Sequence, residues 1–318
     1  MRARGAGVDL SAVATACAAV LEGTEEPRFH HTSHLHVRVG GDVVVDEHLR
    51  GPLVNDVYSV TKSVLATTLG VLAAEGGLPG LDQLVSRVLP ELLGTPAETH
   101  TWRHLLSMTR GAETGGAWDV DEITALPGGQ VAHIAAAPQR SPPGRVFAYD
   151  NGGSHLIAAA ATRLLGEPVS EYADRVLLAP LGIRSPIWQC DPDGIPFGYG
   201  HLRLAARDLA RLGQLWLDRG APLVDPAFFA EMTRPQSAGG PPENLPYGFL
   251  TWLDEGVLVA GGWAGQHLVV VPQASAVVVV TGDPRFDPGP PARDELPEDW
   301  RPALHLVRRH LLPVLVGH

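Results

Sequence analysis

The most informative stretch of the chain is Tyr58-Ser59-Val60-Thr61-Lys62-Ser63, which places a serine and a lysine in an S-x-x-K arrangement. Turn-forming residues precede it, and apolar residues then recur at helical spacing until Gly76-Gly77, so we expect a helix that begins at or just before Ser59. Residues three apart in a helix lie on one face. The Ser59 hydroxyl and the Lys62 amine should therefore point into the same cavity at the helix N-terminus.

This pairing is chemically meaningful because a serine hydroxyl is a weak nucleophile until a neighbouring base removes its proton. A lysine serves as that base when burial or nearby positive charge lowers its pKa. The helix N-terminus adds backbone N–H groups that stabilise a developing anion. The plainer interpretation is a helix-capping serine followed by a solvated lysine, because S-x-x-K also occurs by chance.

Composition narrows the possible partners. The chain has 318 residues and a net charge of −11 without a basic stripe, which argues against nucleic acid or an anionic membrane as partner. Cys17 and Cys190 are too few for a disulfide framework, so we expect buried free thiols. Residues 10–21 predict a packed amphipathic helix rather than a signal peptide, and no run is long enough to span a membrane. We therefore expect a cytoplasmic protein.

Four histidines at positions 30, 31, 34 and 36 raise the question of a metal site. Apolar residues alternate with His34, His36 and Arg38, which predicts a half-buried strand with its polar face in water, followed by a hairpin. No carboxylate or cysteine close by completes a ligand set, so we expect no metal at this strand.

The order of the remaining elements indicates an α+β fold. Beyond the central helix, the patterns predict short helices at 101–111, 208–217 and 226–232, a longer helix at 155–165, and a helix at about 300–315. We expect residues 115–129 to form an irregular segment that is a candidate wall or lid for a pocket, and residues 283–297 to form a surface loop. Strands are expected at 247–252, 256–260, 266–271 and 276–281. We infer a single domain, 1–318, with a sheet lobe (1–57 plus 244–318) and an inserted helical lobe (58–243).

A second motif, Tyr149-Asp150-Asn151, opens the helix that follows it, and a third stretch, Ala260-Gly261-Gly262-Trp263, lies between predicted strands. With Ser59 and Lys62, these stretches resemble the serine β-lactamase and penicillin-binding-protein superfamily, in its class C and esterase-type branch. They are also similar to 6-aminohexanoate-dimer-hydrolase-like members. The resemblance implies a β-lactamase-like fold with a mixed, mostly antiparallel sheet built from both chain ends and flanked by helices.

The resemblance also implies roles for individual residues. Ser59 would be the acylated nucleophile, Lys62 its proton acceptor, and Tyr149 the group that delivers a proton to the leaving group. Asn151 would hold Lys62 or the substrate. The oxyanion hole would be formed by the backbone N–H groups of Ser59 and Trp263.

The sequence departs from the family pattern in two places. Of the third motif, usually K-T-G or H-x-G, only Gly262 survives, and Asp150 stands where serine is common. The charge of Asp150 would raise the pKa of Lys62 if its side chain pointed inward. Arg110 and Arg145 are the candidates to supply the positive charge that the third motif lacks.

We therefore expect a cofactor-independent serine hydrolase that acts through an acyl-enzyme on a small ester or amide. A β-lactamase or D-amino-acid peptidase is the alternative among enzymes, and a catalytically idle binding protein of the same fold is the alternative outside them. The sequence has no G-x-S-x-G elbow, Walker loop, dinucleotide fingerprint or H-E-x-x-H motif. It gives no indication of an oligomeric state.

Overall fold

The structure is a computed structural model that describes residues 8–285, 296 and 298–317. Helices and strands mix as the sequence predicts, and a large antiparallel sheet is flanked by helices. The chain forms two compact units. The first comprises Met1–Val60, Arg203–Asp218 and Glu255–His318, and the second comprises Thr61–Leu202 and Arg219–Asp254. The first unit thus includes residues 203–218, which the sequence analysis assigns to the helical lobe.

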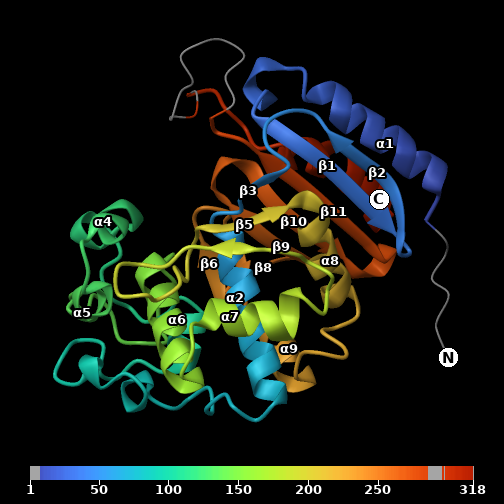
Figure 1. The fold of residues 1–318 in the computed structure, drawn as a ribbon. Coiled ribbons are helices and arrows are strands. Elements are labelled where there is room, and N and C mark those ends of the chain that lie inside the picture. The colour runs from blue at the N-terminus through green and yellow to red at the C-terminus, as the bar shows by residue number, and fades with distance from the viewer. Residues whose placement is uncertain (1–7, 286–295, 297, 318) are drawn as a thin grey trace. The chain divides into compact units, whose positions relative to one another are not determined.

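The first unit is built on antiparallel strands from both ends of the chain, as expected (Figure 1). Their spatial order is β2 (Asp42–His48), β1 (Thr32–Val39), β11 (Ala276–Gly282), β10 (Gln266–Val271) and β9 (Val257–Gly262). β10 and β11 are buried on both faces and consist largely of valine, a residue that packs well on a pleated surface. Short β3 (Val54–Asp56) pairs with β5 (Leu202–Ala205) through Val54 and Ala205.

Helices cover this sheet. α8 (Ala206–Leu217) packs on β1, β10 and β11, and Gly213 allows the close approach. α1 (Leu10–Gly23) runs beside β1 and β2 and buries Val13, Cys17 and Val20 (Figure 1). It also packs on a C-terminal helical segment composed of α10 (Leu304–Leu306), a π-helical turn (Val307–Leu311) and α11 (Leu312–Val316).

The prediction that the polar face of the first strand lies in water is wrong. His34 and His36 are each only 4 % exposed. Residues that pair across antiparallel strands point to the same face, and Arg38 pairs with Val277, which lies under Gly213 of α8. The alternating pattern predicted the strand correctly, but the helix that covers its polar face comes from much later in the sequence.

The second unit is mainly helical. Its helices are α2 (Val60–Ala74), α3 (Trp102–Leu106), α4 (Val120–Ala125), α5 (Gln130–Ala135), α6 (Asn151–Leu165), α7 (Val169–Ala173) and α9 (Pro226–Met232). Its strands are β4 (Ile187–Trp188), β6 (Ser237–Gly240), β7 (Leu245–Tyr247) and β8 (Trp252–Asp254). α9 begins and ends at the predicted residues because Asp225 caps it and Pro226 occupies its first turn.

Several predicted boundaries are wrong. Residues 247–252 do not form one strand, because the chain turns between β7 and β8 and Leu250 adopts a φ of 49°. α3 ends at Leu106 rather than near Gly111, and residues 115–129 contain α4. The last helical segment begins at Leu304 rather than Trp300. Most of the predicted loop 283–297 lies outside the described residues.

The prediction that both cysteines are buried free thiols is confirmed only in part. Both are free, but Cys190 is exposed whereas Cys17 is buried. Within the described part of the chain, no helix has the length and apolar character needed to cross a membrane.

The helix–sheet contact at Gly213 yields a stability prediction. A Cβ at this position would lie 2.5 Å from a methyl group of Val277 and 2.8 Å from one of Leu268. Because overpacking costs about 1–3 kcal/mol, Gly213→Leu should lower the free energy of unfolding by about that amount, measured by urea denaturation. Arg211→Leu introduces the same side chain on the same helix at a position that is 43 % exposed, and should change stability little. Equal stabilities of the two variants would contradict this packing.

Candidate active site

Ser59 directly precedes Val60, the first residue of α2, and Lys62 lies in the first turn of that helix. The helix therefore begins one residue after Ser59, slightly later than the sequence predicts. Ser59 is half-buried, whereas Lys62 is 1 % exposed. Tyr58, just before the serine, has a φ of 46°, and its N–H donates to the Asp56 carboxylate at 2.7 Å. A non-glycine residue in this region is strained, and such strain is common where a functional group must be held in place.

The side chain of Lys62 is held by two oxygen acceptors within the second unit. Its Nζ donates to Oδ1 of Asn151 at 2.8 Å and to the backbone carbonyl of Tyr199 at 3.2 Å. The same Nζ lies 4.9 Å from the centre of the Tyr149 ring. The structure thus brings together the predicted residues Lys62, Tyr149 and Asn151, and adds the carbonyl of Tyr199.

Burial lowers the pKa of Lys62 to about 7, and the opposing effect of the Asp150 carboxylate is smaller. A substantial fraction of the amine is therefore neutral near pH 7. A neutral amine has two N–H groups and one lone pair. Asn151 and Tyr199 provide acceptors for both N–H groups, so any further partner of a neutral Nζ must donate a hydrogen bond to it. This is the arrangement that a general base requires.

Lys62 is also the only lysine among the 24 lysine and arginine residues of the sequence; the other 23 are arginines. An arginine cannot lose its proton in a protein, whereas a buried lysine can. The chain therefore has its single lysine at the position where a neutral amine is chemically useful. The sequence analysis missed this signal, which a simple count would have revealed.

Tyr149 is positioned by an aromatic neighbour. Its ring stacks on Trp252 with the centroids 5.9 Å apart and the planes within 6° of each other. Trp252 in turn contacts Tyr247 and Phe147. This packing fixes the plane of the tyrosine ring, and hence the direction of its hydroxyl. Trp252 is a positioning residue that the sequence analysis did not identify.

Asp150 is buried and paired. It accepts hydrogen bonds from Arg110 Nε at 2.5 Å and Arg110 Nη2 at 3.2 Å, and caps α6 by accepting from the N–H of Gly153 at 2.8 Å. Its charge does raise the pKa of Lys62, but less than burial lowers it. Arg110 is 2 % exposed and committed to this pair, which removes it as a source of charge for a substrate. Arg145 remains exposed.

Gly262 lies against the backbone around the nucleophile, within the first unit. A Cβ at Gly262 would lie 2.5 Å from the carbonyl oxygen of Val57 and 3.3 Å from the nitrogen of Ser59. The surviving glycine of the third motif is thus required by close backbone contact. Trp263 follows it, is 49 % exposed, and packs edge-on against Tyr58 with the ring centroids 5.1 Å apart.

A second buried pair packs against the Tyr199 ring. His155 lies one helical turn beyond Asn151 on α6, and its Nε2 is 2.9 Å from Asp191. Its ring packs 5.8 Å from that of Tyr199. The side chains of the pair are fully buried. The sequence analysis did not predict this pairing, because His155 is one polar residue in an otherwise apolar predicted helix.

Comparisons with known proteins identify the family. The sequence matches the Beta-lactamase family over residues 31–295. The chain belongs to the Beta-lactamase family. The resemblance inferred from its motifs is confirmed at the level of family and fold.

Solved structures of the Beta-lactamase family fold are similar over most of the chain. A Bacillus anthracis protein provisionally named as a 6-aminohexanoate-dimer hydrolase shares 17 % identity at a TM-score of 0.74, covering 93 % of this chain and 81 % of its own. A provisionally named β-lactamase of Bacteroides dorei DSM 17855 shares 18 % at 0.73, covering 94 % and 98 %. EstCE1, described as a hydrolase with promiscuous acyltransferase activity, shares 18 % at 0.71, covering 86 % and 94 %.

The single lysine makes its protonation directly measurable. Protein labelled with ¹³C at lysine Cε should give one lysine NMR signal, whose pH titration has a midpoint of about 7. Asp150→Asn should move this midpoint to lower pH, because the carboxylate raises the pKa of Lys62. Asp121→Asn changes an acidic residue elsewhere in the second unit and should leave the midpoint unchanged. A wild-type midpoint near the model-peptide value of roughly 10.4 would contradict the burial described here.

Proposed function

We propose that the protein is a serine hydrolase that forms an acyl-enzyme on Ser59 and acts on a small ester or amide, as a cytoplasmic enzyme without a cofactor. The observation that carries this proposal is the buried Lys62, whose pKa is lowered to about 7 one turn after Ser59 at the start of α2. Membership of the Beta-lactamase family supports the same reaction class.

In the proposed mechanism, Lys62 Nζ removes the proton of the Ser59 hydroxyl as the oxygen attacks the substrate carbonyl carbon. The oxygen that becomes negative is stabilised by the N–H groups of Ser59 and Trp263, and the tight contact of Gly262 with the Ser59 backbone supports this assignment. The bond to the leaving group then breaks, and the proton passes from Lys62 through the Tyr149 hydroxyl to the leaving oxygen or nitrogen. In the second half of the reaction, water attacks the acyl carbon and gives its proton to the Lys62–Tyr149 pair, the bond to the Ser59 oxygen breaks, and that oxygen takes the proton as the acid is released.

Asn151 and the Tyr199 carbonyl have a positioning role in this mechanism. By accepting both N–H groups of a neutral amine, they direct its lone pair and favour the rotamer that is productive. Trp252 does the same for the Tyr149 ring through stacking.

The nucleophile can be tested by covalent labelling. A fluorophosphonate or an activated ester should label Ser59, and mass spectrometry of the digested protein locates the adduct. Ser59→Ala should abolish labelling and reduce ester hydrolysis by up to about 10⁶-fold, the loss seen when a serine nucleophile is removed.

Ser63→Ala is the matched control, because Ser63 lies on the same helix but is 2 % exposed and donates to the carbonyl of Leu250. It should keep both labelling and activity. An adduct on another serine would refute the assignment of Ser59, and a folded wild-type protein that neither labels nor hydrolyses esters would favour the idle binding protein.

The proton acceptor predicts the pH dependence. Only neutral Lys62 accepts a proton, so kcat/KM should rise with pH through an apparent pKa of about 7 and then level off. Lys62→Arg keeps the charge but cannot deprotonate, and should be nearly as inactive as Lys62→Ala. Tyr149→Phe removes only a hydroxyl and should lose much of the activity. Lys62→Arg with near wild-type activity would show that the lysine is merely structural.

Substrate preference follows from the reduced third motif. Ala260 and Gly261 offer neither a charge nor a side-chain donor where β-lactamases bind the substrate carboxylate, and Arg110 is occupied by Asp150. A hydrogen bond to a charged group contributes roughly 1.5–3 kcal/mol, so loss of two such contacts should weaken transition-state binding at least 100-fold. We expect much higher kcat/KM for p-nitrophenyl acetate or butyrate than for nitrocefin or benzylpenicillin.

Both substrate types are compared on one preparation, with Ser59→Ala as the blank. Arg145→Ala serves as a second control, since Arg145 is the remaining candidate for carboxylate binding and its loss should not change the ratio. Efficient penicillin hydrolysis with weak esterase activity would instead favour the β-lactamase or peptidase alternative.

A further inference from the structure

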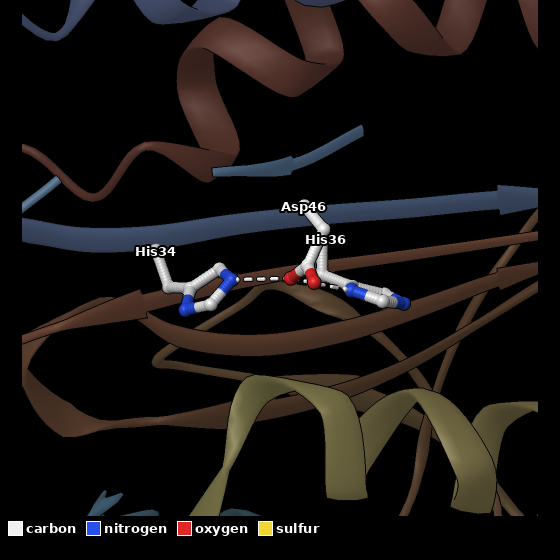
Figure 2. A group of neighbouring side chains, drawn as sticks. All are labelled: His34, His36 and Asp46. Atoms are coloured by element: carbon white, nitrogen blue, oxygen red, sulfur yellow. Dashed lines mark hydrogen bonds and ion pairs between the residues drawn. The ribbon is translucent and has the colours of Figure 1, made fainter. Parts of the chain in front are cut away.

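A cluster of possible metal ligands lies within the first unit, on β1 and β2 (Figure 2). His34 Nε2 lies 2.7 Å from Asp46 Oδ1, and His36 Nδ1 lies 3.0 Å from the same oxygen. One ligand atom from each of the three residues falls within 4.8 Å of the other two. The sequence analysis rejected a metal here because it found no carboxylate nearby, and that reason is wrong.

The sheet explains how the cluster forms. His34 and His36 are two residues apart on β1, so their side chains lie on the same face. Asp46 pairs directly with His36 across β1 and β2, which brings its carboxylate between the two rings (Figure 2). All three residues are held by paired strands rather than by loops, so their donor atoms are pre-positioned.

We propose that His34, His36 and Asp46 bind one divalent transition-metal ion of the zinc type. Two imidazole nitrogens and a carboxylate oxygen are a common ligand set for Zn²⁺, which takes four ligands at about 2.0–2.2 Å from N and O donors. Water would supply the fourth ligand on the side of Asp46, whose side chain is 21 % exposed, whereas those of both histidines are 5 % exposed.

The alternative is a purely structural hydrogen-bond network. In it, the two rings donate N–H groups to Asp46, and Arg207 on α8 donates to the second carboxylate oxygen at 2.6 Å. Arg207 is 62 % exposed and can withdraw, so its contact does not prevent an ion from binding.

A bound ion would join two strands at the edge of the sheet. β2 is the terminal strand in the spatial order, held on one side by β1. A metal shared by Asp46 on β2 and the histidines on β1 would stabilise this hairpin against opening, because an ion that binds only the folded state raises its stability. This role is independent of Ser59 and of the proposed hydrolysis.

The test uses the full-length chain without an affinity tag, titrated with Co²⁺ and monitored by its ligand-field absorption, and then with Zn²⁺ in competition. The wild type should bind one equivalent of the metal ion, and its melting temperature should be higher with Zn²⁺ than without it. His34→Gln/His36→Asn keeps hydrogen-bond donors close to the original nitrogens but removes both imidazoles. It should fold, as judged by circular dichroism, and bind at least tenfold more weakly.

Two further variants separate this site from other histidines and from the structural network. The ring of His48 lies 5.7 Å from that of His34, but His48 is not one of the three proposed ligands. The His48→Gln variant should therefore bind the metal ion with an affinity within threefold of that of the wild type. Arg207→Ala frees a carboxylate oxygen and removes a positive charge, so it should bind several-fold more tightly.

The proposal is overturned if the wild type shows no saturable one-to-one binding. It is equally overturned if the histidine double variant binds as well as wild type, or if His48→Gln loses binding while the double variant keeps it. If the double variant does not fold, Asp46→Asn, which leaves both rings in place, must show the same tenfold loss for the proposal to stand.

Discussion

The chemistry available to the candidate active-site residues of the second unit depends on the burial of one ionisable group, the Lys62 amine. Removing an ammonium group from water is unfavourable, and the group responds by losing its proton more readily. The two acceptors on Nζ, from Asn151 and Tyr199, satisfy the neutral form, and the tightly paired Arg110 and Asp150 anchor the start of α6 that carries Asn151. The site therefore combines a buried amine of lowered pKa with two acceptors that satisfy its neutral form.

This arrangement explains the balance of charges around the lysine. An unpaired carboxylate next to Lys62 would hold the proton on the amine and oppose its use as a base. Asp150 is close enough to raise the pKa of Lys62, yet it shares its charge with the Arg110 guanidinium in a bidentate contact. Burial outweighs the remaining effect. The departure from the family pattern at position 150 is thus compensated by a buried arginine from another part of the chain.

Local signals predicted most of the elements, and long-range contacts explain the failures. The start of α2 to within a residue of Ser59, the bounds of α9 and the β1–β2 hairpin follow from caps, turns and alternation, which act within a few residues. The break between β7 and β8 depends instead on distant partners: the Leu250 N–H donates to the carbonyl of Leu106. Tyr199 was missed for a similar reason, because it contributes a backbone carbonyl, which carries no residue-specific signal.

The proposed reaction class and the proposed substrate class rest on different features of the chain. The features that support hydrolysis are a helix start, a buried amine and a glycine whose missing side chain lets two backbone segments meet. These are properties of the fold, and they tolerate changes in side chains that only touch substrate. The carboxylate-binding part of the third motif is of that second kind, and here it has been reduced to Ala260 and Gly261. Membership of the Beta-lactamase family therefore supports the reaction class proposed for Ser59, whereas the proposed substrate class is argued from the side chains present at Ala260 and Gly261.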